Sequence, residues 1–220
     1  IGIMTCLECQ IELEDESTQE LQQLVIATNS MPEQDWVKTR SYCWMVSLLH
    51  FDKLFQIPLV LSHNLGKISY RKMIESFTDK KMLQDFPILH EINSFFLDKA
   101  RDIQLGGSEY CASKDWLNIW WYADEYIFIK LVAENKIDSF YNEAYKLLLM
   151  VLNSNNINLS ETILKDAIKL NRALLRLPFD YVNETVTTSS NIFELYMNMI
   201  ASESIPVNTL PHKYLIQKEK

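Results

Sequence analysis

Glycine is scarce in this chain: only four of its 220 residues are Gly, and six are Pro. Few glycines mean few backbone positions that readily adopt positive φ, and therefore few tight hairpins. The only adjacent pair, Gly106-Gly107, does not make a glycine-rich loop of the kind that holds phosphate groups. This scarcity predicts helices joined by polar loops.

Chain length and composition are those of a globular protein. Hydrophobic residues make up 48% of the chain and charged residues 23%, and a globule of this length buries roughly 70% of the surface of its unfolded chain. We expect a mostly α fold (α with minor β). It would be a single helical domain over residues 21–220, with about eight helices and two or three short strands near the chain ends. Residues 1–20 are polar and acidic and are predicted to form an arm or linker.

The clearest helix start lies at Ser30-Met31-Pro32-Glu33. Ser30 is a favourable N-cap, Pro32 suits an early helical position, and Glu33 completes a capping box. The predicted helix runs from Met31 to about Phe51. Cap residues and apolar 3–4 spacing predict further helices over residues 69–77, 85–105, 124–132, 137–152, 160–177 and 190–201.

Two other features predict breaks and strands. Pro58 and residues 62–66 are expected to interrupt the apolar segment after Phe51, with Gly66 just past a helix end. Residues 24–28, 181–188 and 212–216 are strand-like in composition. Because these segments lie near both ends of the chain, they can pair with each other or with a missing partner.

Net charge and hydropathy exclude several classes of protein. The net charge is −8 and basic residues occur only in short groups, which disfavours nucleic-acid binding. No run of 18 apolar residues exists, and the first residues lack the basic region of a signal peptide. We therefore predict a cytoplasmic protein that does not bind nucleic acid or span a membrane.

The cysteines and histidines form no complete catalytic or metal motif. Cys6-Leu7-Glu8-Cys9 has the spacing of half a zinc site, but the chain offers no second half. Free thiols in a reducing compartment are the simpler interpretation of the four cysteines. The four histidines show no pairing at helical distance, and no Ser, Cys or Thr lies in a nucleophile motif. We assign no catalytic residue and no metal ligand.

Polar residues mark one arc of the predicted 31–51 helix. At about 100° per residue, this arc contains Trp36, Arg40, Cys43, Ser47 and His50. Buried polar groups need partners. Arg40 can clamp an anionic ligand beside Trp36 or Trp44, or it can pair with an internal carboxylate and stack on Trp36. We favour the second, structural interpretation.

A second group is aromatic: Trp116, Trp120, Trp121 and Tyr122, followed by two acidic residues. This group can form a ligand surface or a docking face for another domain. An ordinary aromatic layer of the core is the simpler interpretation, and we favour it.

Three segments resemble a known family. Residues 25–40, followed by Cys43-Trp44-Met45 and Leu48-Leu49-His50, resemble the region after the radical SAM barrel in proteins with an N-terminal cobalamin-binding domain. Residues 121–125 are similar to a later family element, with Tyr122 and Ala123 in place of prolines. Residues 210–216 look like the family's closing strand.

The resemblance implies that this chain is the C-terminal helical module of a cobalamin-dependent radical SAM enzyme, a methyltransferase in this interpretation. The parent would use a [4Fe-4S] cluster, S-adenosylmethionine and cobalamin, held by upstream barrel and cobalamin domains of the same polypeptide, and this chain would hold none of them. The module would cap the barrel and shape the substrate pocket through Arg40, Trp44 and His50. The alternative is a stand-alone helical interaction module that docks through Trp116, Trp120 and Trp121.

Overall fold

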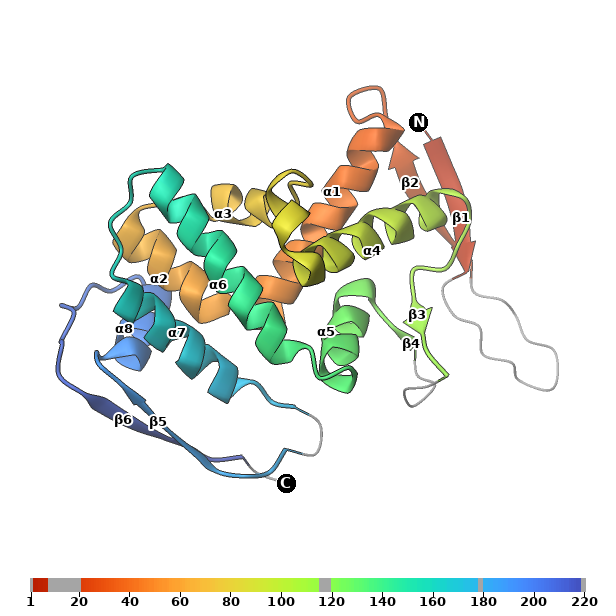
Figure 1. The fold of residues 1–220 in the computed structure, drawn as a ribbon. Helices are drawn as coiled ribbons and strands as arrows, with labels where there is room; N and C mark the ends of the chain where they lie inside the picture. Colours follow the sequence, from red (N-terminus) through yellow and green to blue (C-terminus); the bar gives the residue numbers. More distant parts are fainter. Residues whose placement is uncertain (1, 8–20, 115–119, 178–179, 219–220) are drawn as a thin grey trace.

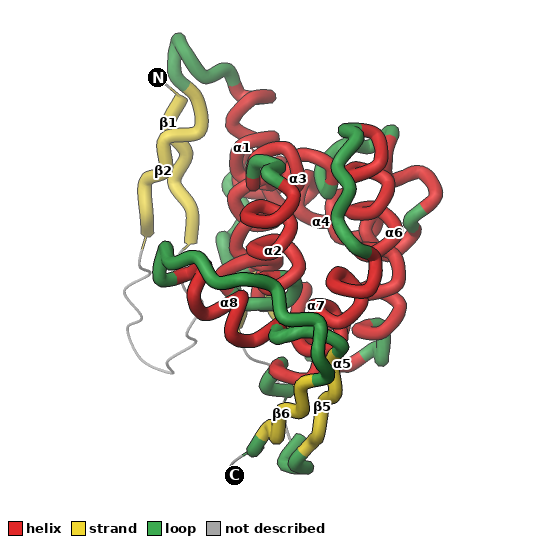
Figure 2. The backbone as a smooth tube through the Cα atoms, turned by 90° about the vertical axis from the view of Figure 1, so that its left-hand side faces the viewer, coloured by secondary structure: helices red, strands yellow, loops and turns green. Residues whose placement is uncertain are grey.

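The computed structural model describes residues 2–7, 21–114, 120–177 and 180–218 (Figure 1). Within these ranges the chain is mostly helical, with eight α-helices, one π-helical turn and one 3-10 turn. The helices form the body of the molecule and the short strands lie at its margins (Figures 1 and 2). The expected fold class, mostly α with minor β, is therefore confirmed.

The helical elements follow one another along most of the chain. Their bounds are α1 Glu33–Val46, η1 Ser47–Phe51 (the π-helical turn), α2 Gln56–Gly66, α3 Tyr70–Ser76, η2 Met82–Asp85 (the 3-10 turn), α4 Pro87–Gln104, α5 Ala123–Ala133, α6 Ile137–Ser154, α7 Glu161–Leu174 and α8 Ile192–Ile200.

The strands form three separate antiparallel pairs: β1 Gly2–Leu7 with β2 Leu21–Ala27, β3 Cys111–Ala112 with β4 Trp120–Trp121, and β5 Glu184–Thr188 with β6 His212–Ile216. The β1–β2 and β5–β6 hairpins lie at opposite ends of the molecule (Figure 1). Two of the three predicted strand segments, 181–188 and 212–216, therefore pair with each other, whereas the segment 24–28 pairs with β1 and not with a strand from the other chain end. Each strand finds a nearer partner in the sequence, which costs less loop-closure entropy.

The N-terminal segment is partly ordered into structure. Residues 2–7 of the expected acidic arm form β1, which pairs with β2 from Gly2 opposite Ala27 to Leu7 opposite Leu21. Residues 8–20, which carry most of the acidic side chains of that arm, lie outside the described residues.

Helix α1 begins three residues later than Ser30. The backbone N–H groups of Thr28 and Met31 each donate to the carbonyl of the other, and the Met31 N–H also donates to Thr28 Oγ1 at 3.0 Å. Ser30 therefore lies inside a closed turn, and Pro32 takes the N-cap position without a side-chain cap bond. The predicted capping box is wrong: the Ser30 hydroxyl lies 3.2 Å from Thr28 Oγ1, and no side chain caps the start of α1.

Helix α2 runs through Pro58, which was expected to break it. Pro58 is the third residue of the helix, where a backbone N–H has no intrahelical partner to lose. Gly66 ends the helix and Lys67 adopts the left-handed conformation, with φ 56°. Glycine at 66 reflects close packing, because a Cβ there would approach Ile157 Cγ2 to 3.0 Å.

Most of the remaining predicted helix starts are confirmed. The Ser69 hydroxyl caps α3 by accepting the Lys72 N–H at 3.2 Å. Pro87 occupies the first turn of α4, and α7 follows Ser160. In each case a cap-forming residue or proline precedes apolar residues at helical spacing.

The core has two parts that share α2. The larger part contains most helices and includes the fully buried rings of Phe55, Phe77, Phe96 and Phe140. The smaller part joins α2 to α7, α8 and β5 through Ile57, Leu61 and their neighbours. Helix α2 is thus buried on two faces.

In the described part of the chain no single helix is long and apolar enough to cross a bilayer. One bent pair, 33–51 with 56–66 at an angle of 92°, passes on length and composition when the two helices are taken together.

Candidate functional site

The widened turn η1 at the end of α1 is the most unusual backbone feature near the predicted site residues. The Asp52 N–H donates to the Ser47 carbonyl at 2.8 Å, five residues back instead of four. Such π-helical turns occur frequently at functional sites. His50 lies within this turn, and Tyr42, Val46 and His50, each four residues apart, line one pocket.

The His50 pocket has a volume of about 610 Å³ and lies between α1, α2, α3 and α8. Its lining is mainly apolar and consists of Tyr42, Val46, His50, Gln56, Leu59, Val60, Tyr70, Ile74, Met199 and Ile200. Apolar pockets of this size with a few polar groups are the usual form of small-molecule sites. The geometry therefore makes this pocket a candidate binding site.

His50 brings a neutral imidazole to this pocket. Burial lowers the pKa of the His50 ring below its ordinary value, so the ring is uncharged at neutral pH. Its Nδ1 atom is buried and has no hydrogen-bond partner among the described residues. The ring meets Tyr70 edge-on at a centroid distance of 5.9 Å. A neutral imidazole can donate or accept a hydrogen bond to a ligand.

Arg40 and Trp44 form a different group on another side of α1. The Arg40 guanidinium is ion-paired with Glu109, and its Cζ lies 4.8 Å from the centroid of the Trp44 ring. The predicted pairing with an internal carboxylate is confirmed, but the stacking partner is Trp44 instead of Trp36. Neither Arg40 nor Trp44 lines the His50 pocket. The structure thus brings together two of the three predicted substrate-binding residues and leaves His50 apart.

The other members of the predicted polar arc are dispersed. Trp36 is buried in the core, whereas Cys43 is exposed. The predicted arc is therefore not one buried polar face, because its members differ in how far the neighbouring elements cover them.

The carboxyl group of Asp52, just after η1, lies near those of Asp124 and Glu125. No pattern in the sequence predicted this proximity. Burial, together with the nearby carboxylates of Asp124 and Glu125, raises the pKa of Asp52 to about 7. Asp52 Oδ2 is buried and unpartnered within the described part of the chain. Asp52 therefore changes protonation near neutral pH. Its partners lie more than 70 positions away in the sequence, which is why sequence reasoning missed the group.

The described residues offer no site for a metal cluster. In the part of the chain that the structure describes, no group of three or more His, Cys, Asp or Glu side chains is arranged so that it could hold a metal ion. Cys43 and Cys111 are both free, and burial raises the pKa of the Cys111 thiol to about 11. Cys6 belongs to β1, and Cys9 lies outside the described residues.

The aromatic group after residue 115 is partly on the surface. Trp120 is 42% exposed and Tyr122 is 45% exposed, whereas Trp121 is half-buried. The Tyr122 hydroxyl lies 3.1 Å from that of Tyr110. The favoured interpretation as a layer of the core is therefore wrong for Trp120 and Tyr122, because β4 pairs only with the two-residue strand β3. Trp116 lies outside the described residues.

Comparison with protein-family models gave no match, and comparison with curated protein sequences gave none either. The functional interpretation of this chain therefore depends on the residues, contacts and pockets described above.

Proposed function

We propose that this chain is the C-terminal helical module of a cobalamin-dependent radical SAM enzyme, a methyltransferase, and that it shapes the pocket for the enzyme's substrate. The observation that carries this proposal is the His50 pocket. A neutral imidazole with an unpartnered buried nitrogen lies on a mainly apolar cavity of about 610 Å³. Such a cavity fits a hydrophobic substrate that is oriented by one polar contact.

The segments that resemble the radical SAM family support the proposal. The longest of them, residues 25–50, spans the end of β2, α1 and most of η1 and contains His50, whereas residues 121–125 lie at the start of α5 and residues 210–216 include β6. The two strands β1 and β2 make a sheet of only two strands, which is rarely stable alone. Val25 of β2 is about half exposed. An unpaired sheet edge next to an exposed apolar residue suits docking against further domains of the same polypeptide.

The cofactors of the proposed enzyme belong to other parts of the parent protein. The [4Fe-4S] cluster, S-adenosylmethionine and cobalamin would be held by the upstream barrel and cobalamin domains. The described residues of this chain do not converge as ligands for a cluster, so we derive no chemical step through these groups. In this interpretation the module works in the cytoplasm with the domains that precede it.

The first test concerns the parent protein. We expect the coding DNA upstream of Ile1 to contain an in-frame Cys-x-x-x-Cys-x-x-Cys motif. A start codon only a few residues upstream would overturn the radical-enzyme proposal.

The second test concerns His50 in the full-length enzyme. We expect His50→Ala to lower kcat/KM on the order of tenfold, through loss of a substrate contact, while iron content stays unchanged. His90→Ala is the matched control, because His90 is exposed on α4. Unchanged kcat/KM in His50→Ala would remove His50 from the substrate site.

Arg40 needs a paired test, because it is already bound to Glu109. Both Arg40→Ala and Glu109→Gln disrupt this ion pair, but only the first removes the guanidinium. If Arg40 contacts the substrate, turnover falls in Arg40→Ala and is retained in Glu109→Gln. Equal losses in both variants would assign Arg40 a purely structural role.

A second candidate function is a stand-alone interaction module with no chemistry. The observation that favours it is the exposure of Trp120 and Tyr122, because exposed aromatic rings often anchor protein interfaces. The docking face would include Trp120 and Trp121, with Trp116 as a further predicted member. Replacement of both Trp120 and Trp121 by Ala should abolish partner binding, and unchanged binding to every partner would rule this function out.

A further inference from the structure

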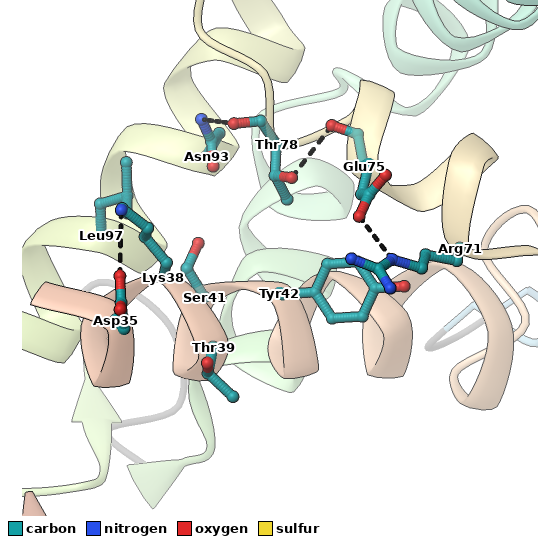
Figure 3. Close-up of a pocket in the computed structure, with 10 residues that line it drawn as sticks. All are labelled: Asp35, Lys38, Thr39, Ser41, Tyr42, Arg71, Glu75, Thr78, Asn93 and Leu97. Carbon is teal, nitrogen blue, oxygen red and sulfur yellow. Dashed lines mark hydrogen bonds and ion pairs between the residues drawn. The ribbon is translucent and has the colours of Figure 1, made fainter. Parts of the chain in front are cut away.

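A second pocket of about 610 Å³ lies between α1, α3 and α4 (Figure 3). Tyr42 lines both this pocket and the His50 pocket. The other lining residues are Asp35, Lys38, Thr39, Ser41, Arg71, Glu75, Thr78, Asn93 and Leu97. The lining is thus more polar than that of the His50 pocket.

Two buried oxygen atoms in this lining have no hydrogen-bond partner among the described residues. They are Ser41 Oγ on α1 and Asn93 Oδ1 on α4, and each residue is only 1% exposed. In Figure 3 the Ser41 hydroxyl points from α1 toward α4, and Asn93 Oδ1 points from α4 toward α1. Unpaired buried polar atoms cost free energy, so a hydrogen-bonding group placed between these two atoms would be stabilising.

The hydrogen bond made by Asn93 Nδ2 fixes the orientation of the side-chain amide. Asn93 Nδ2 donates to the Thr78 carbonyl at 3.2 Å. A flipped amide would place Oδ1 against that carbonyl, and two acceptors repel each other. Asn93 therefore presents an acceptor to the cavity. The Ser41 hydroxyl can rotate and present a donor.

The charged residues around this pocket are already neutralised. Lys38 Nζ lies 3.1 Å from Asp35 Oδ1, and Arg71 Nε lies 2.7 Å from Glu75 Oε1. Two cations and two carboxylates leave no excess charge to attract an ion. The Tyr42 ring and Leu97 add apolar surface.

We infer that this pocket binds a small uncharged molecule through a carboxamide or lactam group. Such a group carries an N–H donor beside a carbonyl acceptor. The N–H would donate to Asn93 Oδ1, and the carbonyl would accept from the Ser41 hydroxyl. The rest of the ligand would lie against Tyr42 and Leu97. This inference does not depend on the radical-enzyme proposal.

Benzamide is the first probe, with acetophenone as its matched comparison. Both are flat and uncharged and carry a carbonyl group, but acetophenone has no N–H. Binding is measured by titrating each compound into the purified protein and following backbone amide shifts by NMR. We expect benzamide to shift resonances of α1, α3 and α4, with an affinity about tenfold higher than that of acetophenone.

Ser41→Ala tests the protein side of the contact. We expect this variant to weaken benzamide binding about tenfold, because the carbonyl loses its donor. Ser62→Ala is the matched control: Ser62 Oγ is also buried and unpartnered in the described structure, but Ser62 does not line this pocket. Benzamide should bind Ser62→Ala as it binds the unmodified protein.

Three results would overturn the inference. The first is that benzamide does not shift the resonances of α1 and α4. The second is that acetophenone binds as tightly as benzamide. The third is that Ser41→Ala keeps the full affinity for benzamide. A crystal structure in which an ordered water joins Ser41 Oγ to Asn93 Oδ1, and in which soaked benzamide does not displace it, would likewise assign the two oxygens to hydration.

Discussion

Two buried asparagines, Asn171 on α7 and Asn93 on α4, differ in their hydrogen bonding. Asn171 Oδ1 accepts the Ile57 N–H at 2.9 Å. The two N–H groups of Asn171 Nδ2 are shared among three oxygens at 2.8–3.0 Å: the Tyr141 hydroxyl and the carbonyls of Lys53 and Leu54. Asn93 makes one bond through Nδ2 and leaves Oδ1 unpartnered among the described residues.

The difference separates a structural role from a binding role. Asn171 binds the connection that leads from η1 into α2 and satisfies an N–H in the first turn of α2, which has no intrahelical partner. It therefore holds in place the backbone that follows His50. Asn93 satisfies one backbone carbonyl and presents its free oxygen to a pocket. A fully satisfied buried amide stabilises the fold, whereas a half-satisfied one is suited to receive a ligand.

The largest expected effect is that of Asn171→Ala. The substitution leaves the Ile57 N–H, the Tyr141 hydroxyl and two backbone carbonyls without this partner. We expect the free energy of unfolding to fall by about 4 kcal/mol, which lowers Tm on the order of 10 °C. Differential scanning calorimetry measures this change. The matched substitution Asn93→Ala should cost only about 1 kcal/mol, and equal losses at the two sites would break the comparison.

Tyr141→Phe sharpens the same comparison by removing one bond of the Asn171 group. The Tyr141 hydroxyl accepts from Asn171 Nδ2 and is buried. We expect a loss of about 1.5 kcal/mol, seen in urea unfolding as a lower midpoint with an unchanged m-value. Tyr145→Phe is the control, because the Tyr145 hydroxyl bonds to Glu161 at the surface. A larger loss in Tyr145→Phe would contradict the assigned importance of the Asn171 group.

Asp52→Asn tests the pH dependence of the segment that Asn171 holds. The pKa of Asp52 is raised to about 7 in the folded protein, so the folded state holds this proton more tightly than the unfolded state. The contribution of Asp52 to stability is therefore full below about pH 4 and is lost as the pH rises through about 7.

Asp52→Asn does not titrate, so we expect it to be more stable than the unmodified protein by about 1 kcal/mol at pH 8. The two proteins should be equally stable at pH 4. Thermal unfolding across this range measures the difference. Asp98→Asn, on the exposed face of α4, should leave the pH profile of stability unchanged, and a flat difference between Asp52→Asn and the unmodified protein would refute the raised pKa.

The smallest expected effect is that of Ser41→Ala beside Asn93. Alanine favours the helix interior and removes an unpartnered buried hydroxyl, so we expect a gain of about 0.5 kcal/mol. Ser76→Ala is the contrast, because the Ser76 hydroxyl is buried and donates to the Met73 carbonyl at 2.6 Å. Chemical denaturation should show a gain for the first and a loss for the second. A loss in Ser41→Ala would mean that Ser41 already has a partner.

Local sequence signals predicted much of the fold. Helices α3, α4, α6 and α7 begin and end close to the predicted residues, because cap residues and apolar spacing act within a few positions. Strands β5 and β6 also fall inside their predicted segments. The errors at Ser30 and Pro58 have local causes: a competing Thr28–Met31 turn, and a proline early enough in α2 to be tolerated.

The candidate sites could be predicted only in part. His50 was found because its sequence neighbours resemble a family segment, and the pairing of Arg40 with a carboxylate was found because a buried guanidinium needs one. The partner itself, Glu109, lies 69 positions away. Asp52, Ser41 and Asn93 gave no signal, because an unpaired or protonated group is defined by what surrounds it in space.

The sequence by itself determined the helical class, the approximate helix boundaries and the acidic net charge, because these depend on composition and on contacts within one or two turns. Only the tertiary structure decided which polar atoms are satisfied. Asn171 meets Ile57 across 114 positions and becomes a fully bonded structural residue, whereas Asn93 meets Thr78 and keeps an oxygen free. Two identical side chains on two helices thus differ in role, because hydrogen bonding in the interior depends on which distant backbone groups are brought by packing within hydrogen-bonding distance.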